Sequence, residues 1–297
     1  MHFHKTLSLF ILLMCFAEHL MFAQIESEKK NLDVLNYDVK LEVDIDDESV
    51  KGTINIGFQI SPDAKKVVFD CGNLQIIKIT GENVSDFTQE NGRVSISLDS
   101  RKERENHIQI TYSGNPSHGM IFLPKNKEVY TVFSTSQWMV CNDVPSDKAR
   151  FKLELTIPAN QSCIASGSLV QTSVDEEDIK YKWIQDYETP SYTYGFAMGP
   201  FNNYQEDHGE ISLNYYSSTN TSEELETIFR PSGEIIDFFE EKSGVTYAQS
   251  SYSQILVGNH YQEMSGFSVL KESYGRLVLK DSTETNLISH ELAHQWW

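Results

Sequence analysis

The sequence is poor in cysteine, which limits how the fold can be held together. It contains four cysteines in 297 residues. Cys15 lies in an N-terminal segment considered below, so Cys71, Cys141 and Cys163 remain. These three can form at most one internal disulfide, and no CxxC spacing suggests a metal knuckle. The stability of the chain must therefore come from its hydrophobic core.

Basic residues are also scarce. The chain has 24 Lys and Arg against 43 Asp and Glu, which gives a formal net charge of -19. Phosphate backbones and anionic lipid surfaces repel such a chain, so nucleic-acid binding is not expected. After the N-terminal segment, no apolar run reaches the roughly 18 residues of a membrane helix, so no span is expected in the mature chain. With 39% hydrophobic residues, however, the chain is too apolar to stay disordered.

The first 23 residues have the features of a signal peptide. Lys5 precedes an apolar run at residues 7–16, and the segment ends at Ala23. The run is too short to cross a bilayer. We predict that residues 1–23 are removed and that the protein is exported to the periplasm, the cell surface or the extracellular space. A buried N-terminal helix is the alternative, although nothing caps it, and Cys15 leaves a lipid anchor open.

Residues 24–205 contain short segments in which apolar and polar residues alternate. Every second residue is apolar from Tyr37 to Ile45, which is typical of a half-buried strand. Further strands are predicted at residues 51–60, 66–69, 74–79, 94–98, 107–112, 151–157, 181–184 and 192–198. No helical pattern interrupts them. We therefore predict an antiparallel β domain over residues 24–205, either a sandwich or a curved sheet.

Helical patterns begin in residues 206–297. Thr221 is a candidate N-cap for a helix that Pro231 and Gly233 kink or split and that Gly244 ends. Two more strands are predicted at residues 211–216 and 253–257.

A last helix is predicted at the C-terminus. Asp281 and Glu284 resemble a capping box, and the pattern then continues to Trp297. Because natural domains rarely end inside a helix, we expect the chain to be a fragment of a longer protein.

This last helix carries an HExxH motif. His290 and His294 are four residues apart, so their imidazoles lie one turn apart on one face and can bind one metal ion. Neutral imidazoles suit zinc, and Glu291 can take a proton from a zinc-activated water. The alternative is an ordinary helix whose polar residues share a solvated face. We predict one zinc ion, with His290 and His294 as ligands and Glu291 as the catalytic base.

At residues 290–296 the chain resembles the zinc helix of the M1 family of metallopeptidases, the aminopeptidase N and leukotriene A4 hydrolase relatives. Residues 141–151 are similar to the family's C-x-D-x-P-x-x-K-A-x-F stretch, and residues 158–169 to its P…A-S-N-G-x-L pattern. Residues 194–201 resemble the strand that ends its N-terminal domain. The resemblance implies a mostly β N-terminal domain, followed at residues 206–297 by the start of an α+β thermolysin-like catalytic domain. It also implies a zinc-dependent aminopeptidase that acts on peptides.

The zinc site departs from the family pattern. In the family, a Glu further along the chain is the third zinc ligand, and a later Tyr stabilises the oxyanion. Both positions fall beyond residue 297. Two imidazoles leave zinc under-coordinated relative to a His₂Glu site. We therefore expect the 297-residue chain to have little or no activity alone.

The segment that recognises the substrate amine, G-x-M-E-N in the family, also differs. If Met264 matches the Met, Ser265 replaces the Glu that binds the α-amino group. Glu263 is one position early, and in a strand it faces the opposite side unless the backbone bulges. Gln137 is the candidate for an N-terminal-domain Gln that also holds the amine, and a surface polar role is its alternative. The resemblance thus gives Glu263, Met264 and Gln137 as candidate substrate-binding residues.

Two other functions stay open at this point. The altered amine-recognition segment permits an endopeptidase. A non-catalytic, β-rich module that binds peptides or glycans on the same scaffold is the second alternative.

Overall fold

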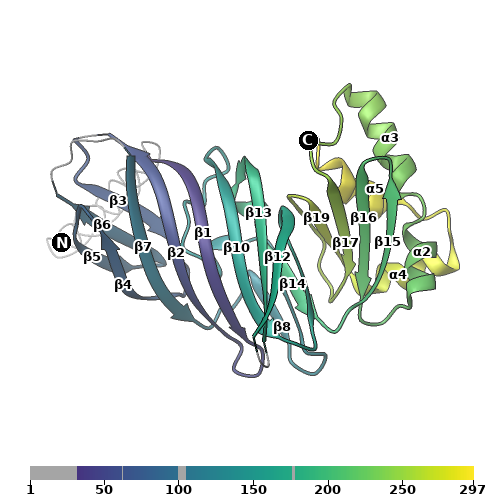
Figure 1. Cartoon of the computed structure of the whole chain (residues 1–297), viewed down its shortest axis with the longest axis horizontal. Helices are drawn as coiled ribbons and strands as arrows, with labels where there is room; N and C mark the ends of the chain where they lie inside the picture. The colour runs from purple at the N-terminus through teal and green to yellow at the C-terminus, as the bar shows by residue number, and fades with distance from the viewer. Residues whose placement is uncertain (1–31, 62, 100–104, 176–177) are drawn as a thin grey trace, which may run out of the picture.

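The computed structural model describes residues 32–61, 63–99, 105–175 and 178–297. The predicted signal peptide at residues 1–23 lies outside them. Figure 1 shows a large body of β-sheets at the N-terminal end of the molecule and a second group of strands, with the α-helices, at the other end.

A seven-stranded sheet dominates the first body. Its strands are β1 (Leu32–Asp44), β2 (Ser49–Ile60), β4 (Gln75–Gly81), β7 (Glu105–Gly114), β10 (Lys148–Pro158), β12 (Ser168–Asp175) and β13 (Asp178–Pro190). Their spatial order is β12-β13-β10-β1-β2-β7-β4. Neighbours are antiparallel, except that β1 and β10 run parallel. The predicted alternation holds in β1, where Tyr37, Val39 and Leu41 are buried.

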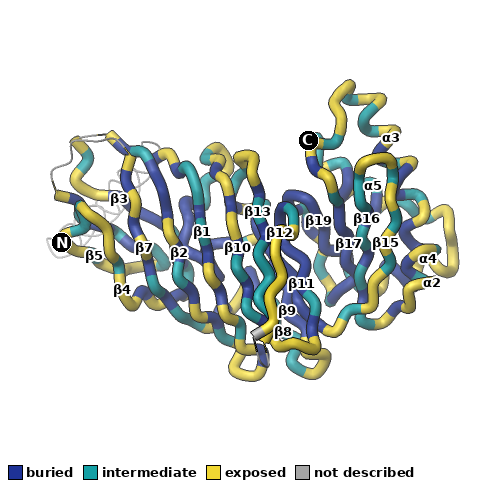
Figure 2. Tube along the Cα trace, viewed as in Figure 1, coloured by how far each residue is buried: buried dark blue, intermediate teal, exposed yellow. Residues whose placement is uncertain are grey.

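Two smaller sheets complete this body. One contains β3 (Lys66–Asp70), β6 (Arg93–Leu98) and β5 (Val84–Glu90), and the other contains β11 (Ser162–Ala165), β14 (Phe196–Gly199), β9 (Glu128–Thr131) and β8 (Met120–Leu123). Strands β9 and β14 are buried along their whole length. In Figure 2, the chain is dark blue, and so buried, where this sheet lies next to the second group of strands. The mostly β prediction for this region is confirmed.

The strand predicted at residues 192–198 is shorter than expected. Residues Ser191–Thr193 form a 3-10 turn (η2), and the strand begins only at Phe196. The hydroxyl of Tyr194 lies 2.6 Å from the carbonyl of Ala149 and 2.7 Å from that of Thr189. The Tyr194 ring also stacks on Phe151 with centroids 4.3 Å apart. These buried contacts hold the segment in a turn that a period-two pattern does not reveal.

The second group of strands forms a five-stranded sheet. Its order is β15-β16-β17-β19-β18, from β15 (Asn202–His208), β16 (Ile211–Ser217), β17 (Ser251–Leu256), β19 (Phe267–Leu270) and β18 (Gln262–Met264). Strands β16, β17 and β19 run parallel, and the two edge strands are antiparallel to them. The expected domain boundary at residue 205 lies inside β15, and the division into domains stays a prediction.

Four α-helices accompany this sheet. They are α2 (Ser222–Phe229), α3 (Ser232–Ser243), α4 (Glu272–Lys280) and α5 (Asn286–Ala293). Helix α4 packs on β17, and α5 packs on β18 and β19. Among the described residues, none of the helices has the length and apolar character that a membrane span requires.

The start of the first helical pair follows the prediction. The Thr221 hydroxyl accepts a hydrogen bond from the backbone N–H of Glu224, and the Glu224 carboxylate accepts one from that of Thr221. This is a capping box. The helix is split at Pro231, and α3 ends at Gly244, which has the left-handed φ of 71° that glycine tolerates best.

The C-terminal helices differ from the prediction in two ways. Helix α4 was missed; its buried residues are Tyr274, Gly275 and Val278. The capping box at Asp281 does not form, because the Asp281 carboxylate accepts hydrogen bonds from the backbone and hydroxyl of Thr283 instead. Helix α5 therefore begins at Asn286, and it ends at Ala293 with a turn after it.

Candidate metal centre

Helix α5 presents the HExxH motif between the sheet and the surface. Ile288 and Leu292 are buried in the core beneath the five-stranded sheet, which fixes the rotation of the helix. Glu291 consequently faces inward and is only 1% exposed. His290 and His294 are exposed on the neighbouring part of the helix surface.

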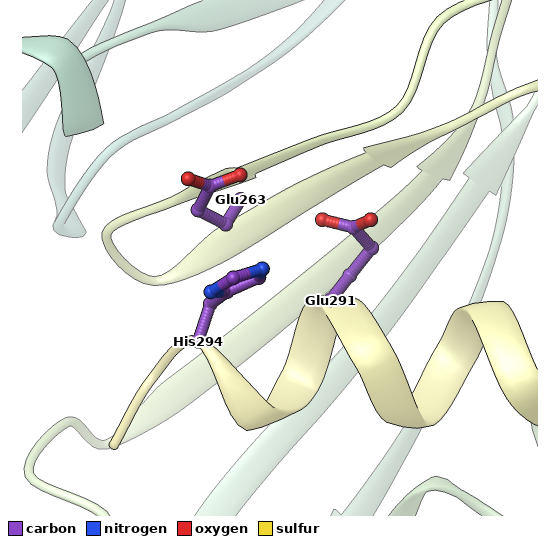
Figure 3. Close-up of side chains that lie close together, drawn as sticks. All are labelled: Glu263, Glu291 and His294. Carbon is purple, nitrogen blue, oxygen red and sulfur yellow. The ribbon is translucent and has the colours of Figure 1, made fainter. Parts of the chain in front are cut away.

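Three potential ligand groups converge at α5. One atom each from Glu263, Glu291 and His294 lies within 4.8 Å of the others. Figure 3 shows Glu263 reaching from its strand toward the other two side chains on the helix. Within the part of the chain that the structure describes, this is the group of His, Cys, Asp and Glu residues with the spacing to hold a metal ion.

His290, the other predicted ligand, is not part of this group, although its ring lies beside that of His294. Its ring centroid is 4.9 Å from that of His294, and the two rings are nearly perpendicular, at 89°. The two imidazoles are therefore neighbours on α5, as the four-residue spacing predicts. Their role as zinc ligands stays a prediction.

Glu291 is in an unusual electrostatic position. Its Oε2 atom is buried and has no hydrogen-bond partner. Burial, and secondarily the charge of Glu263, raises the pKa of Glu291 to about 7. Two carboxylates this close repel each other when both are ionised.

A divalent cation fits this donor set. Carboxylate oxygens and imidazole nitrogens are ordinary zinc ligands. A cation held at the neighbouring imidazoles would offset the repulsion between Glu263 and Glu291 without being coordinated by either carboxylate.

Two glutamine amides fix the hairpin that carries Glu263. On one side, the Gln262 amide accepts from the backbone N–H of Phe133 and donates to the carbonyl of Tyr192 at 3.2 Å. On the other side, Gln295 bonds to the turn between β18 and β19. Sequence reasoning missed both residues, since hydrogen bonds between distant segments leave no local pattern. The one feature of the sequence that could have drawn attention to Gln295 is its position directly after His294.

The neighbours of Glu263 point elsewhere. Met264 is 2% exposed and packs against Gly195 in the first core. Ser265 is buried, and its hydroxyl accepts from the Gln249 amide at 3.3 Å. Strand β18 pairs with β19 without a register shift, so Glu263 lies in the group without a bulge in β18.

Gln137 is buried rather than at the surface. It is 7% exposed and lies against Gly72 and Gly119 in the first body. The surface alternative for Gln137 was therefore wrong. Gln137 is not part of the converging group, and a role in amine recognition stays a prediction.

Comparison with known proteins identifies the family to which this chain belongs. The model of the peptidase M1 N-terminal domain matches residues 34–193, more than half of the chain. The chain belongs to the peptidase M1 family.

Relatives and solved structures extend beyond that domain. "Aminopeptidase 2" of Candida albicans is 20% identical over 90% of this chain and 32% of its own length. "Aminopeptidase N" of Lactobacillus helveticus is 23% identical over 88% of this chain and 34% of its own length. The chain thus spans about a third of the length of these curated relatives.

The fold is that of two-domain M1 peptidases. An M1 zinc metallopeptidase from Deinococcus radiodurans has a TM-score of 0.74 with 19% identity, covering 90% of this chain and 64% of the other. The same enzyme bound to a Tyr-Ser-Ala substrate has a TM-score of 0.73 with 20% identity and the same coverage. The predicted fold, mostly β and followed by a smaller part that combines strands and helices, is confirmed.

Proposed function

We propose that the protein is a zinc-dependent aminopeptidase in which His290 and His294 bind zinc and Glu291 is the general base. The observation that carries this proposal is the convergence of Glu263, Glu291 and His294 at α5. The names of the relatives, aminopeptidases and zinc metallopeptidases, support the same reading.

Each side chain has a separate task. A bound zinc ion supplies Lewis-acid polarisation of the peptide carbonyl and of a water molecule. Glu291 accepts the proton from the attacking water. Glu263 accepts hydrogen bonds from the free α-ammonium group of the peptide, which places the first peptide bond beside Glu291.

The test is Glu291→Gln, compared with Glu234→Gln, which removes the same charge from an exposed site on α3. In a protein that contains these residues and a complete zinc site, we expect Glu291→Gln to keep the zinc content and to lower peptide hydrolysis by about 10²–10⁴-fold, the range for loss of a general base. Glu234→Gln should behave as the wild type. His290→Ala and His294→Ala should each lose zinc. Unchanged hydrolysis in Glu291→Gln would defeat the proposed mechanism.

Substrates with blocked amines separate the related functions. An aminopeptidase cleaves peptides with a free amine and spares their N-acetylated forms, whereas an endopeptidase cleaves both. A peptide- or glycan-binding module would bind without cleaving either.

The proposal also covers the activity of the 297-residue chain and its export from the cytoplasm. We propose that the 297-residue chain hydrolyses peptides weakly or not at all, because the third ligand implied by the resemblance is not among its residues. A protein that contains these residues and a complete zinc site should then be far more active than the 297-residue chain. Export with cleavage would be supported by a mature N-terminus at Gln24, and refuted by a protein that stays in the cytoplasm and keeps Met1.

A further inference from the structure

The hairpin that carries Glu263 ends in a two-residue turn, Ser265 and Gly266, that several segments hold. The backbone of Ser265 is hydrogen-bonded to the first body. Its N–H donates to the carbonyl of Thr193, and its carbonyl accepts from the N–H of Gly167. The carbonyl of Gly266 accepts from Ser253 at 3.0 Å. Two further polar backbone groups lie at this turn, the carbonyl of Met264 and the N–H of Gly266.

One side chain satisfies both of these groups. The Gln295 amide nitrogen donates to the Met264 carbonyl at 3.0 Å, and its amide oxygen accepts from the Gly266 N–H at 3.2 Å. Met264 and Gly266 are buried, so water does not readily replace these bonds. An unpaired buried backbone group costs about 1–3 kcal/mol.

Gln295 is itself held in place. Its backbone N–H donates to the carbonyl of Leu292 at 3.1 Å, which continues the turn after α5. The next residue, Trp296, donates its indole N–H to the carbonyl of Val245 at 2.8 Å. The Gln295 amide therefore connects the turn that follows α5 to the backbone of Met264 and Gly266 at the end of the hairpin.

We propose that Gln295 is a positioning residue that sets the place of the Glu263 carboxylate relative to Glu291 and His294. Recognition of a free α-amino group then depends on this amide, although Gln295 touches neither substrate nor metal. The consequence for amine binding rests on the proposed function. The link between α5 and the hairpin does not, because it is a property of the metal-free chain.

The first measurement is hydrogen exchange at the Gly266 amide in the metal-free chain. Gln295→Met keeps the size of the side chain and removes both hydrogen bonds, so exchange at Gly266 should accelerate about tenfold or more. Gln295→Glu keeps an acceptor and should leave Gly266 protected. It also serves as the second variant if Gln295→Met folds poorly. Exchange at Gly266 that is equal in all three proteins would overturn the proposal.

Gln249→Met is the matched control. Gln249 is also buried and touches the same turn, but its hydrogen bond goes to the Ser265 hydroxyl and not to the backbone beside Glu263. Exchange at Gly266 should stay as in the wild type. An equal acceleration in this variant would mean that any loss of packing loosens the turn, and would overturn the assignment to Gln295.

The second measurement is the binding of two probes to the zinc-loaded protein by calorimetry. One probe is leucine hydroxamate, with a free amine, and the other is its N-acetyl derivative. Gln295→Met should weaken the first about tenfold and leave the second unchanged, as expected when an outer partner of a site is removed. Equal effects on both probes would overturn the positioning role. A wild-type protein that binds no zinc would instead defeat the proposed function, and exchange at Gly266 would then decide the link alone.

Discussion

The side chains of Glu263 and Met264, adjacent in β18, lie on opposite faces of the strand. Glu263 joins Glu291 and His294, whereas Met264 packs against Gly195 in the core of the first body. Neighbouring residues of a strand alternate in this way. If Met264 is matched to the Met of the family pattern, the pattern expects the acidic residue at Ser265. In this chain the acidic residue is Glu263, directly before Met264, and it faces α5.

This division predicts opposite effects for two substitutions. Met264→Ala should lower the free energy of unfolding by about 2–5 kcal/mol, because it leaves a cavity in a closed core. Glu263→Gln should leave the free energy of unfolding unchanged or raise it slightly, since it removes a like charge beside Glu291. Urea unfolding followed by circular dichroism measures both. A neutral Met264→Ala would contradict the placement of this side chain.

The same Glu263→Gln change should alter substrate choice in the zinc-loaded protein. Loss of a hydrogen-bonded charge for the α-ammonium group should lower kcat/KM for free-amine substrates about 10- to 100-fold. Cleavage of N-acetylated substrates should not change. If free-amine substrates are cleaved as before, Glu263 has no part in amine recognition.

Gly195 should tolerate no larger side chain. A Cβ added there would lie 2.3 Å from the sulfur of Met264 and 2.4 Å from the hydroxyl of Thr131. The thioether can move, but the Thr131 hydroxyl is buried and accepts from the backbone N–H of Phe196 at 2.9 Å. We expect Gly195→Ala to destabilise the chain by about 1–3 kcal/mol.

A double variant provides the control for this prediction. Met264→Ala empties part of the space that the new methyl group needs. Gly195→Ala combined with Met264→Ala should therefore cost less than the sum of the two single changes. Strict additivity would show that the Met264 side chain is not part of the clash.

The cap of α2 gives an independent test of the helical part. Thr221→Ala removes the hydroxyl that accepts from Glu224, and should cost about 1 kcal/mol. Thr227→Ala is the matched control, because Thr227 is a half-buried residue in the same helix and its hydroxyl donates to the Glu223 carbonyl within the helix instead of capping an end. Thermal or urea unfolding that ranks Thr227→Ala as the more damaging change would contradict the capping box.

Much of this architecture could be predicted from local pattern. Alternation located most strands, and Thr221, Pro231 and Gly244 located the starts and ends of α2 and α3. The parallel pairing of β1 with β10 could not be predicted, because β1 has the same alternation of apolar and polar residues whichever way β10 runs. Asp281 misled because its carboxylate can cap a turn as readily as a helix.

The site was predictable only where its residues are close in sequence. His290, Glu291 and His294 follow from the spacing of one helix. Glu263 joins them through the packing of β18 against α5, and Gln262 and Gln295 act through bonds to segments far along the chain. The periodicity of apolar residues in a single sequence predicts local structure, and it does not show which distant segments come into contact.

The stability of the chain should fall between about pH 9 and pH 11 because of Cys71. Burial raises the pKa of this thiol from its ordinary 9.0 to about 11, with a smaller opposing effect of the Gln89 amide. Above pH 9 the unfolded chain loses this proton while the folded chain keeps it, so stability is complete below that pH and is lost as pH rises to about 11. The loss amounts to about 3 kcal/mol at 1.36 kcal/mol per unit. Cys71→Ala, followed by urea unfolding over this range, should show a correspondingly shallower decline, whereas the buried tyrosines affect both proteins alike. Parallel curves for the two proteins would show that Cys71 does not titrate as its burial requires.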